Sequence, residues 1–381
     1  MRADWNYPTA IRFGPGRLCE LADACRELGM DKPLLVTDPG LARSPMVERA
    51  AGGCPRLAIF SEIQANPTGE NVARGVEFYR EAGCDGVIAL GGGSSLDAGK
   101  AIALMIGQGR PLWDFEDRED NWKRVRVEGM PPVVAVPTTS GTGSEVGRVS
   151  IITDTAARVK RFIFHPRMLP QRVIADPELT LGLPPGLTAA VGMDALSHCL
   201  EAYCSPLHHP MADGIAAEGL ALVRRSLLRA YRDGADLEAR ADMLAAAMMG
   251  ATAFQKGLGA VHSLSHPLGA HFGLHHGLLN GILTPYVLEF NRPAVEGRLS
   301  RLSAYLGLSG SAGLLDWILE LRREMGIPHT LAELGLREDE VLPLAGEAAR
   351  DPSASTNPVP VDEEAHRELF RRSLAGDVSV F

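Results

Sequence analysis

The clearest structural signal in the first half of the chain is the stretch Gly86-Val-Ile-Ala-Leu-Gly-Gly-Gly-Ser-Ser-Leu-Asp97. Its opening apolar run is typical of a buried strand, and the glycine run predicts a turn before a helix that continues through Met105. Glycines after a strand let the backbone approach a ligand, and the first N–H groups of a helix can bind an anion such as a pyrophosphate. The same glycines could serve only a tight turn. They match neither the GxGxxG fingerprint nor a P-loop.

Strand, turn and helix signals repeat on both sides of this stretch. Further strands are predicted at Pro33–Thr37, Leu57–Phe60 and Pro132–Val136, and further helices from the turn Phe13-Gly-Pro-Gly16 to Leu28 and over Glu70–Gly83. Such alternation, with uninterrupted apolar strands, predicts a parallel sheet that helices cover on both faces. We therefore expect residues 1–185 to form an α/β domain with an open, mostly parallel, Rossmann-like sheet.

The strand at Pro132–Val136 runs into a loop that is rich in hydroxyl groups, Pro137-Thr-Thr-Ser-Gly-Thr-Gly-Ser-Glu145. Ligands of α/β sheets collect at the carboxyl ends of strands, so we expect this loop to contact a ligand rather than only to cap a helix. Asp38 ends an earlier strand. It is suitably placed to accept hydrogen bonds from an adenosine ribose and to repel a 2′-phosphate, although it could equally be a turn residue before Pro39.

The second half of the chain has a different pattern. The strand signal fades after Leu183-Pro-Pro-Gly186, and a chain of 381 residues exceeds the roughly 250–300 at which single cores stop growing. Helices are expected at about Thr188–Tyr203, Pro210–Tyr231, Leu237–Phe254, Gly259–Ala270, Gly277–Phe290, Gly313–Met325 and Glu363–Leu374. Their richness in Ala, Leu and Met suits buried helices. Residues 186–381 are therefore expected to form an all-helical domain.

Two histidine-bearing segments of this half, Asp194–His198 and His262–His276, indicate a metal site. Residues four apart on a helix lie on the same face, so Asp194 and His198 can aim a carboxylate and an imidazole at one point. Three nitrogen ligands and one carboxylate, with a position left open for substrate, suit a catalytic Fe(II) or Zn(II). Spacing alone leaves open which of the later histidines take part, and a lone helical histidine is more often a satisfied core residue.

Composition excludes several classes of partner. The formal net charge of −9 argues against a nucleic acid, and no stretch approaches the roughly 20 consecutive apolar residues of a membrane-spanning helix. The first ten residues hold no basic region followed by an apolar run, so we expect no secretory signal. Six cysteines without a CxxC pair suit reduced thiols. We expect a cytoplasmic protein.

With these residues in view, the chain resembles the iron-containing (group III) alcohol dehydrogenase family over essentially its whole length. The resemblance rests on motifs that occur in order: Phe13-Gly-Pro-Gly16, Val36-Thr-Asp38, Asn66-Pro-Thr68, Gly91-Gly-Gly-Ser-Ser-Leu-Asp97, Pro137-Thr-Thr-Ser-Gly-Thr-Gly-Ser-Glu145, Gly192-Met-Asp-Ala-Leu-Ser-His198, and His262-Ser-Leu-Ser-His-Pro-Leu-Gly269 with His276-Gly277. So many motifs in order are very unlikely to arise by chance.

The resemblance implies a role for particular residues. The metal ligands map to Asp194, His198, His262 and His276. His266 lines the pocket without binding the metal, and serves either as a proton relay or as a group that orients a ligand. The residues implied for the nicotinamide dinucleotide are Asp38, Asn66, Gly92, Gly93, Ser94, Ser95, Asp97, Thr138, Thr139, Thr142, Ile151, Lys160 and Leu179. An acidic residue at the position of Asp38 favours NAD over NADP.

The implied activity is that of a metal-dependent alcohol dehydrogenase with the two-domain plan of dehydroquinate synthase-like proteins. A hydride moves between a small primary alcohol, or its aldehyde, and NAD(H), while Fe(II) or Zn(II) holds the alcohol oxygen as a Lewis acid. Alternatives are a glycerol dehydrogenase-like, dehydroquinate synthase-like or maleylacetate reductase-like enzyme, and, from another class, a metal-binding structural oligomer that binds no nucleotide. We also expect a homo-oligomer, a dimer.

Overall fold

The computed structural model describes residues 9–379. The segment on which the expectation about a secretory signal depends therefore lies mostly outside the described residues. The described chain divides into two compact units, one that ends at Gly182 and one that begins at Leu183. The functions predicted for the two halves stay predictions.

The first unit contains a six-stranded sheet in which every pair of neighbouring strands is parallel. The strand order is β1-β8-β5-β4-β2-β3. The strands are β1 (Ala10–Phe13), β2 (Pro33–Val36), β3 (Ala58–Phe60), β4 (Gly86–Gly91), β5 (Val133–Pro137) and β8 (Arg172–Ala175). This confirms the parallel α/β fold predicted from the uninterrupted apolar strands.

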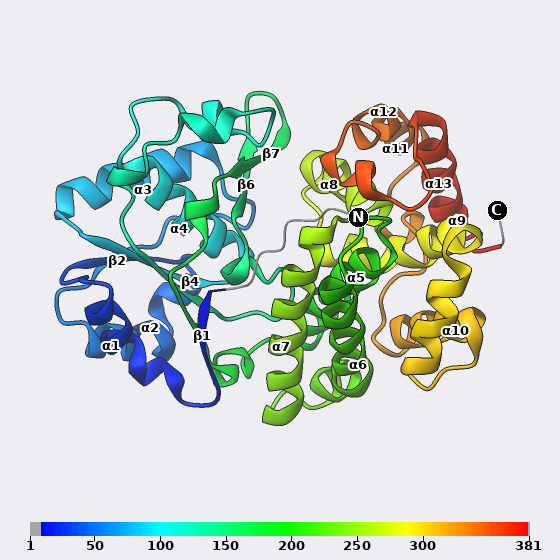
Figure 1. Cartoon of the computed structure of the whole chain (residues 1–381), viewed down its shortest axis with the longest axis horizontal. Helices are drawn as coiled ribbons and strands as arrows, with labels where there is room; N and C mark the ends of the chain where they lie inside the picture. Colours follow the sequence, from blue (N-terminus) through cyan, green and yellow to red (C-terminus); the bar gives the residue numbers. More distant parts are fainter. Residues whose placement is uncertain (1–8, 380–381) are drawn as a thin grey trace. The chain divides into compact units, whose positions relative to one another are not determined.

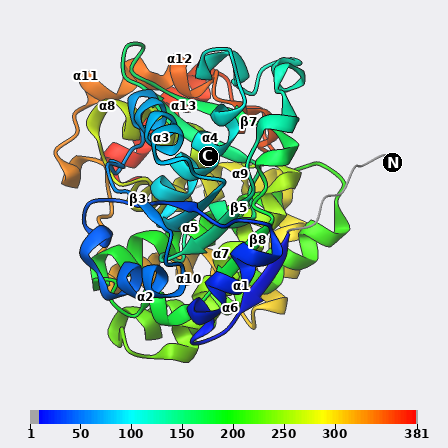
Figure 2. The same ribbon diagram turned by 90° about the vertical axis from the view of Figure 1, so that its left-hand side faces the viewer.

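Helices cover both faces of this sheet (Figures 1 and 2). Neighbouring residues of β2 point to opposite faces, as in any strand. The helices are α1 (Leu21–Glu27), α2 (Pro45–Gly53), α3 (Gly69–Ala82) and α4 (Gly93–Ile106). Leu34 and Val36 pack into a core with α3 and α4, whereas Leu35 packs into a second core with α1 and α2. Two buried faces explain why the strands carry no polar alternation.

Several elements of the first unit were missed in the sequence. They are the edge strand β1, the inner strand β8, the helix α2 and the antiparallel hairpin of β6 (Val149–Asp154) and β7 (Val159–Phe164). The strands β1 and β8 each contain an arginine, Arg12 and Arg172, so neither is an uninterrupted apolar run. The hairpin strands are only partly buried, and polar and apolar residues mix along β7.

The second unit is helical, as predicted, and no strand is found among its described residues. Its helices are α5 (Pro185–Cys204), α6 (Pro210–Arg232), α7 (Leu237–Ala253), α8 (Ala260–Phe272), α9 (His276–Tyr305), α10 (Gly310–Glu324), α11 (Glu338–Val341), α12 (Ala345–Ala348) and α13 (Glu363–Ala375). The helix α9 runs well past the predicted end at Phe290 and includes Pro293. The short helices α11 and α12 were not predicted.

The helix α5 lies at the centre of the second unit, and every residue from Thr188 to Cys204 is buried. Other helices surround α5, here α6, α7 and α9, so its polar side chains are enclosed by protein as well. In the described part of the chain no single helix is long and apolar enough to span a membrane; only α9 and α10 together, bent by 67°, reach that length and composition.

Candidate functional site

The four predicted metal ligands come from three helices of the second unit. Asp194 and His198 lie one turn apart on α5, His262 lies in the first turn of α8, and His276 is the first residue of α9. The helix α8 ends at Phe272 and is capped by Gly273, whose left-handed backbone lets the chain turn into α9. The chain therefore returns to α5 immediately after α8.

Close packing of α9 against α5 requires the glycine that follows His276. A Cβ atom added at Gly277 would lie 2.2 Å from the carbonyl oxygen of Ala190, which is closer than real Cβ atoms come to backbone. Gly277 thus lets the start of α9 approach α5. This approach brings Nε2 of His276 to 3.6 Å from Oδ1 of Asp194.

The donor atoms of the four residues converge. One ligand atom from each of Asp194, His198, His262 and His276 can be chosen so that all four lie within 4.8 Å of one another. Nε2 of His198 lies 3.7 Å from Oδ1 of Asp194, and the rings of His198 and His262 stack with centroids 4.7 Å apart. Asp194, His198 and His262 are buried, while His276 is partly exposed. Of the four side chains, that of His276 is thus the one that solvent reaches.

The chemistry of this donor set fits a divalent metal. Three imidazoles and one carboxylate suit Fe(II) or Zn(II). The side-chain amide nitrogen of Asn280 lies 2.8 Å from Oδ1 of Asp194, 3.1 Å from Nε2 of His276 and 3.3 Å from Nε2 of His262. A group with partial positive charge thus lies where these lone pairs meet, as a cation would.

Glu201 holds His262 in position from the side opposite to the converging donor atoms. Its Oε2 lies 2.5 Å from Nδ1 of His262, and its Oε1 accepts a hydrogen bond of 2.6 Å from the backbone N–H of Val261. Burial lowers the pKa of His262, but the carboxylate of Glu201 outweighs it and the net pKa is raised. With its proton on Nδ1, His262 presents the lone pair of Nε2 to the centre.

His266 lies beside the ligands and has an acidic partner of its own. Its Nδ1 lies 2.8 Å from Oδ2 of Asp351, and its ring stacks on that of His276 with an interplanar angle of 8°. Asp351 is further fixed by the backbone N–H of Ser353. Burial raises the pKa of Asp351, but the contact with His266 outweighs it and the net pKa is lowered. Asp351 therefore fixes the orientation of the His266 imidazole through its Nδ1.

In the first unit, the glycine turn and the hydroxyl-rich loop lie against each other at the carboxyl ends of β4 and β5. A Cβ atom added at Gly93 would lie 2.6 Å from Cγ2 of Thr142, and one added at Gly92 would lie 3.3 Å from Cγ2 of Thr139. No described side chain caps the first turn of α4. Its first N–H groups are therefore available to an anion, such as the pyrophosphate of a dinucleotide.

Asp97 ties this region together. Its carboxylate accepts hydrogen bonds of 2.5 Å from Oγ of Ser144 and 3.0 Å from the backbone N–H of Ile151, and lies 3.3 Å from Nζ of Lys100. These contacts join α4 to the hydroxyl-rich loop and to β6. Asp97 therefore shapes the predicted cofactor site through the loop that it holds.

Three other predicted cofactor residues have little exposure. Ser95 and Thr138 are 2% and 3% exposed. The backbone N–H of Thr138 donates to the carbonyl of Gly91. Leu179 packs in the core beneath α1 and α2. These three buried side chains thus support the predicted cofactor site and present little surface that a cofactor could contact.

The remaining predicted cofactor residues lie around its edge. The carboxylate of Asp38 accepts hydrogen bonds of 2.8 Å and 3.0 Å from the backbone two and three residues on, so it forms the turn that the sequence left open. Its second oxygen receives no bond among the described residues. Asn66 is partly buried, and the hydroxyl of Ser94 donates to the carbonyl of the neighbouring Ala65. Lys160 lies on β7.

Glu145, the last residue of the hydroxyl-rich motif, is buried, which the sequence did not suggest. It is 1% exposed, its Oε1 has no hydrogen-bond partner among the described residues, and burial raises its pKa to about 7. The neighbouring Lys100 is equally buried, and burial lowers the pKa of its ammonium group. Burial thus disfavours the charged form of both side chains under the loop.

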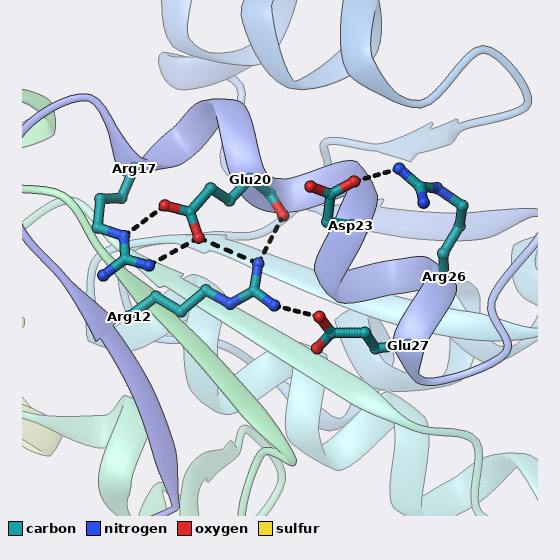
Figure 3. Close-up of a pocket in the computed structure, with 6 residues that line it drawn as sticks. All are labelled: Arg12, Arg17, Glu20, Asp23, Arg26 and Glu27. Carbon is teal, nitrogen blue, oxygen red and sulfur yellow. Dashed lines mark hydrogen bonds and ion pairs between the residues drawn. The ribbon is translucent and has the colours of Figure 1, made fainter.

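A surface pocket of about 700 Å³ lies elsewhere in the first unit, between β1 and α1 (Figure 3). It is lined by Arg12, Arg17, Glu20, Asp23, Arg26 and Glu27. Each of its three guanidinium groups has a carboxylate partner within the pocket, as the dashed lines in Figure 3 show. Because its charges are satisfied internally and none of the predicted site residues lines it, we assign this pocket no ligand.

Three residues of the candidate metal centre were not predicted from the sequence: Glu201, Asn280 and Asp351. Glu201 lies seven residues after Asp194 and Asn280 four residues after His276, so helical spacing alone places them near the ligands. Asp351 carries no such signal, because it lies far along the chain from His266 and comes close only through tertiary packing.

Both halves of the chain match models of one protein family. Residues 8–177 match the family model described as iron-containing alcohol dehydrogenase, and residues 188–374 match that of the C-terminal part of the same family. The chain is 41% identical over 380 residues to 4-hydroxybutyrate dehydrogenase of Cupriavidus necator, a match that covers 97% of this chain and 99% of the relative.

Solved structures agree with these matches. A crystal structure of 1,3-propanediol oxidoreductase superposes with a TM-score of 0.94 at 33% identity, covering 98% of this chain and 100% of that one. Sulfoacetaldehyde reductase from Bifidobacterium kashiwanohense in complex with NAD+ superposes with a TM-score of 0.91 at 30% identity, covering 99% and 100%. The similarity thus extends over both units.

Proposed function

The chain belongs to the iron-containing alcohol dehydrogenase family, and on that premise we propose that it transfers a hydride between a small primary alcohol, or its aldehyde, and NAD(H). It is an oxidoreductase of the iron type. The relatives described above act, by their names, on 4-hydroxybutyrate, 1,3-propanediol and sulfoacetaldehyde. Neither they nor the site geometry favour the glycerol dehydrogenase-like, dehydroquinate synthase-like or maleylacetate reductase-like alternatives.

The convergence of Asp194, His198, His262 and His276 carries this proposal. These four residues would hold Fe(II), or Zn(II) in its place. When bound, the metal supplies Lewis-acid chemistry that favours the alkoxide form of an alcohol.

The protein's own side chains then manage protons and orientation. Glu201 keeps the proton of His262 on Nδ1, on the side away from the centre. Asp351 does the same for His266, so that Nε2 of His266 can accept the hydroxyl proton of an alcohol or return it to an alkoxide. The stacking of His266 on His276 places this imidazole next to a ligand.

For the nucleotide, we propose that the start of α4 receives the pyrophosphate and that Thr139 and Thr142 contact it from the hydroxyl-rich loop. The uncommitted oxygen of Asp38 would accept a hydrogen bond from the adenosine ribose, which favours NAD over NADP. The complex of sulfoacetaldehyde reductase with NAD+ supports NAD as the cofactor.

A screen in both directions tests the proposal. Fe(II)-loaded and Zn(II)-loaded protein would be assayed with NAD+ and small primary alcohols, and with NADH and the matching aldehydes, including carboxylated and phosphorylated ones. We expect turnover of at least one alcohol–aldehyde pair. Failure of every pair, together with no change in NADH fluorescence on adding protein, would favour the metal-binding structural oligomer instead.

We also propose that the chain forms a homodimer and resides in the cytoplasm. The edge strands β1 and β3 carry exposed apolar side chains, Phe13 and Ile59, which a second copy could cover. All six cysteines are free thiols, which suits a reducing compartment. Sedimentation velocity would test the dimer, since a monomer at micromolar concentration contradicts it.

A further inference from the structure

Asn280 is a buried side chain of the metal centre to which the proposed reaction gives no task. It lies one turn after His276 on α9 and is fully buried. Its amide nitrogen is within 2.8–3.3 Å of Oδ1 of Asp194, Nε2 of His262 and Nε2 of His276. The amide thus contacts donor atoms of three of the four metal ligands.

The surrounding hydrogen bonds set the direction of these contacts. Glu201 accepts a hydrogen bond from the Nδ1–H of His262, so Nε2 of His262 carries a lone pair. The hydroxyl of Ser265 donates to the carbonyl of His262 and therefore accepts from Nδ1 of His276, 3.3 Å away, so Nε2 of His276 carries a lone pair as well. Both imidazoles can therefore only accept from the amide, whose two hydrogens are shared among them and the carboxylate of Asp194.

The orientation of the amide itself follows. Its NH₂ group must face the three acceptors, because the reverse orientation would set its oxygen against a carboxylate and two lone pairs. Its Oδ1 is buried and has no hydrogen-bond partner among the described residues. Asn280 is thus held by its donor side alone.

A neutral imidazole nitrogen has one lone pair, which a hydrogen bond and a metal cannot share. We propose that Asn280 closes the metal site before a metal binds, and that an incoming divalent ion must displace its amide from His262 and His276. This inference depends on the proposed function, because the four ligands are those of the proposed enzyme. Its consequence is that Asn280 stabilises the metal-free protein and weakens its affinity for the metal.

Zn(II) affinity of Asn280→Ala tests this consequence. Hydrogen bonds to charged and buried acceptors are lost only from the metal-free state, so we expect Zn(II) to bind about tenfold to a hundredfold more tightly by chelator competition. The melting temperature should fall in the metal-free protein and change less in the Zn(II)-loaded protein. Asn291→Ala is the matched control, since Asn291 lies on the same helix and pairs with Asn357 instead.

The inference is overturned if Asn280→Ala binds Zn(II) with unchanged or weaker affinity than the wild type. If the wild type binds no Zn(II) or Fe(II), both this inference and the proposed function fail. Should Asn280→Ala not fold, crystal structures of the wild type without metal and with Zn(II) decide the matter. The amide nitrogen must leave hydrogen-bonding distance of both Nε2 atoms when Zn(II) is bound, and an amide that stays there refutes the proposal.

Discussion

Replacing Glu201 by glutamine should weaken metal binding without touching a ligand. Glutamine has nearly the same shape, but it has one acceptor oxygen where the carboxylate uses two, toward Val261 and His262. If its oxygen keeps the backbone bond, its NH₂ group faces Nδ1 of His262 and drives the imidazole proton onto Nε2. If it turns round, the NH₂ group faces the N–H of Val261. Either arrangement costs free energy.

The magnitude follows from the geometry. The contact with Nδ1 is 2.5 Å long and both side chains are buried, so the carboxylate acts on His262 with little screening. Loss of such a group behind a histidine ligand typically lowers metal affinity tenfold to a hundredfold, which corresponds to about 1.4–2.7 kcal/mol. We expect Glu201→Gln to fall within this range.

The assay is the Zn(II) dissociation constant from competition with a chromogenic chelator. Glu289→Gln provides the matched control, because Glu289 is also a buried glutamate of the second unit but pairs with Arg292, 2.7 Å away. The control should bind Zn(II) like the wild type. Equal affinity of Glu201→Gln and the wild type would refute the reasoning, because the carboxylate would then have no part in presenting Nε2 of His262.

Three further changes have definite expected outcomes. His266→Ala should keep its metal by elemental analysis while kcat falls about 10²–10⁴-fold, as expected for loss of a proton-transfer group; loss of metal would instead make His266 a ligand. Asp38→Gly should shift the ratio of kcat/KM for NAD+ and NADP+ towards NADP+, and an unchanged ratio would contradict the ribose contact. Glu145 keeps its proton up to about pH 7 in the folded chain but releases it near pH 4.3 when unfolded, so its contribution to the free energy of unfolding declines as pH rises between these values. Glu145→Gln should remove about 3 kcal/mol of that decline in urea titrations at pH 5 and pH 8, and an unchanged difference between the two pH values would show that Glu145 does not carry it.

The fold could be predicted where one physical signal dominated. The strands β2, β4 and β5 are buried on both faces and are therefore continuous apolar runs. The main helices of the second unit are long and rich in Ala, Leu and Met, as buried helices are. The elements that were missed have weaker signals. The hairpin of β6 and β7 is half-exposed, and β1 and β8 gain their stability from pairing with strands distant in sequence.

The site was predictable to a similar extent. The spacing of Asp194 and His198 indicated half of a metal site, but only the family resemblance distinguished His262 from His266 and His276 from His275. The structure adds the convergence of the donor atoms: the four that lie together come from Asp194, His198, His262 and His276, and His266 lies beside them with its Nδ1 at Asp351. Contacts of this kind join residues far apart in the chain, so no local pattern could have shown them.

We propose that α5, α8 and α9 together hold one catalytic metal ion. A crystal structure of the Fe(II)-loaded protein, with anomalous diffraction measured at the iron absorption edge, tests it most directly. We predict a single strong peak within bonding distance of Asp194, His198, His262 and His276. An anomalous peak within bonding distance of His266 or His275 would contradict this assignment. So would the absence of a peak at the four predicted ligands in protein that oxidises alcohols.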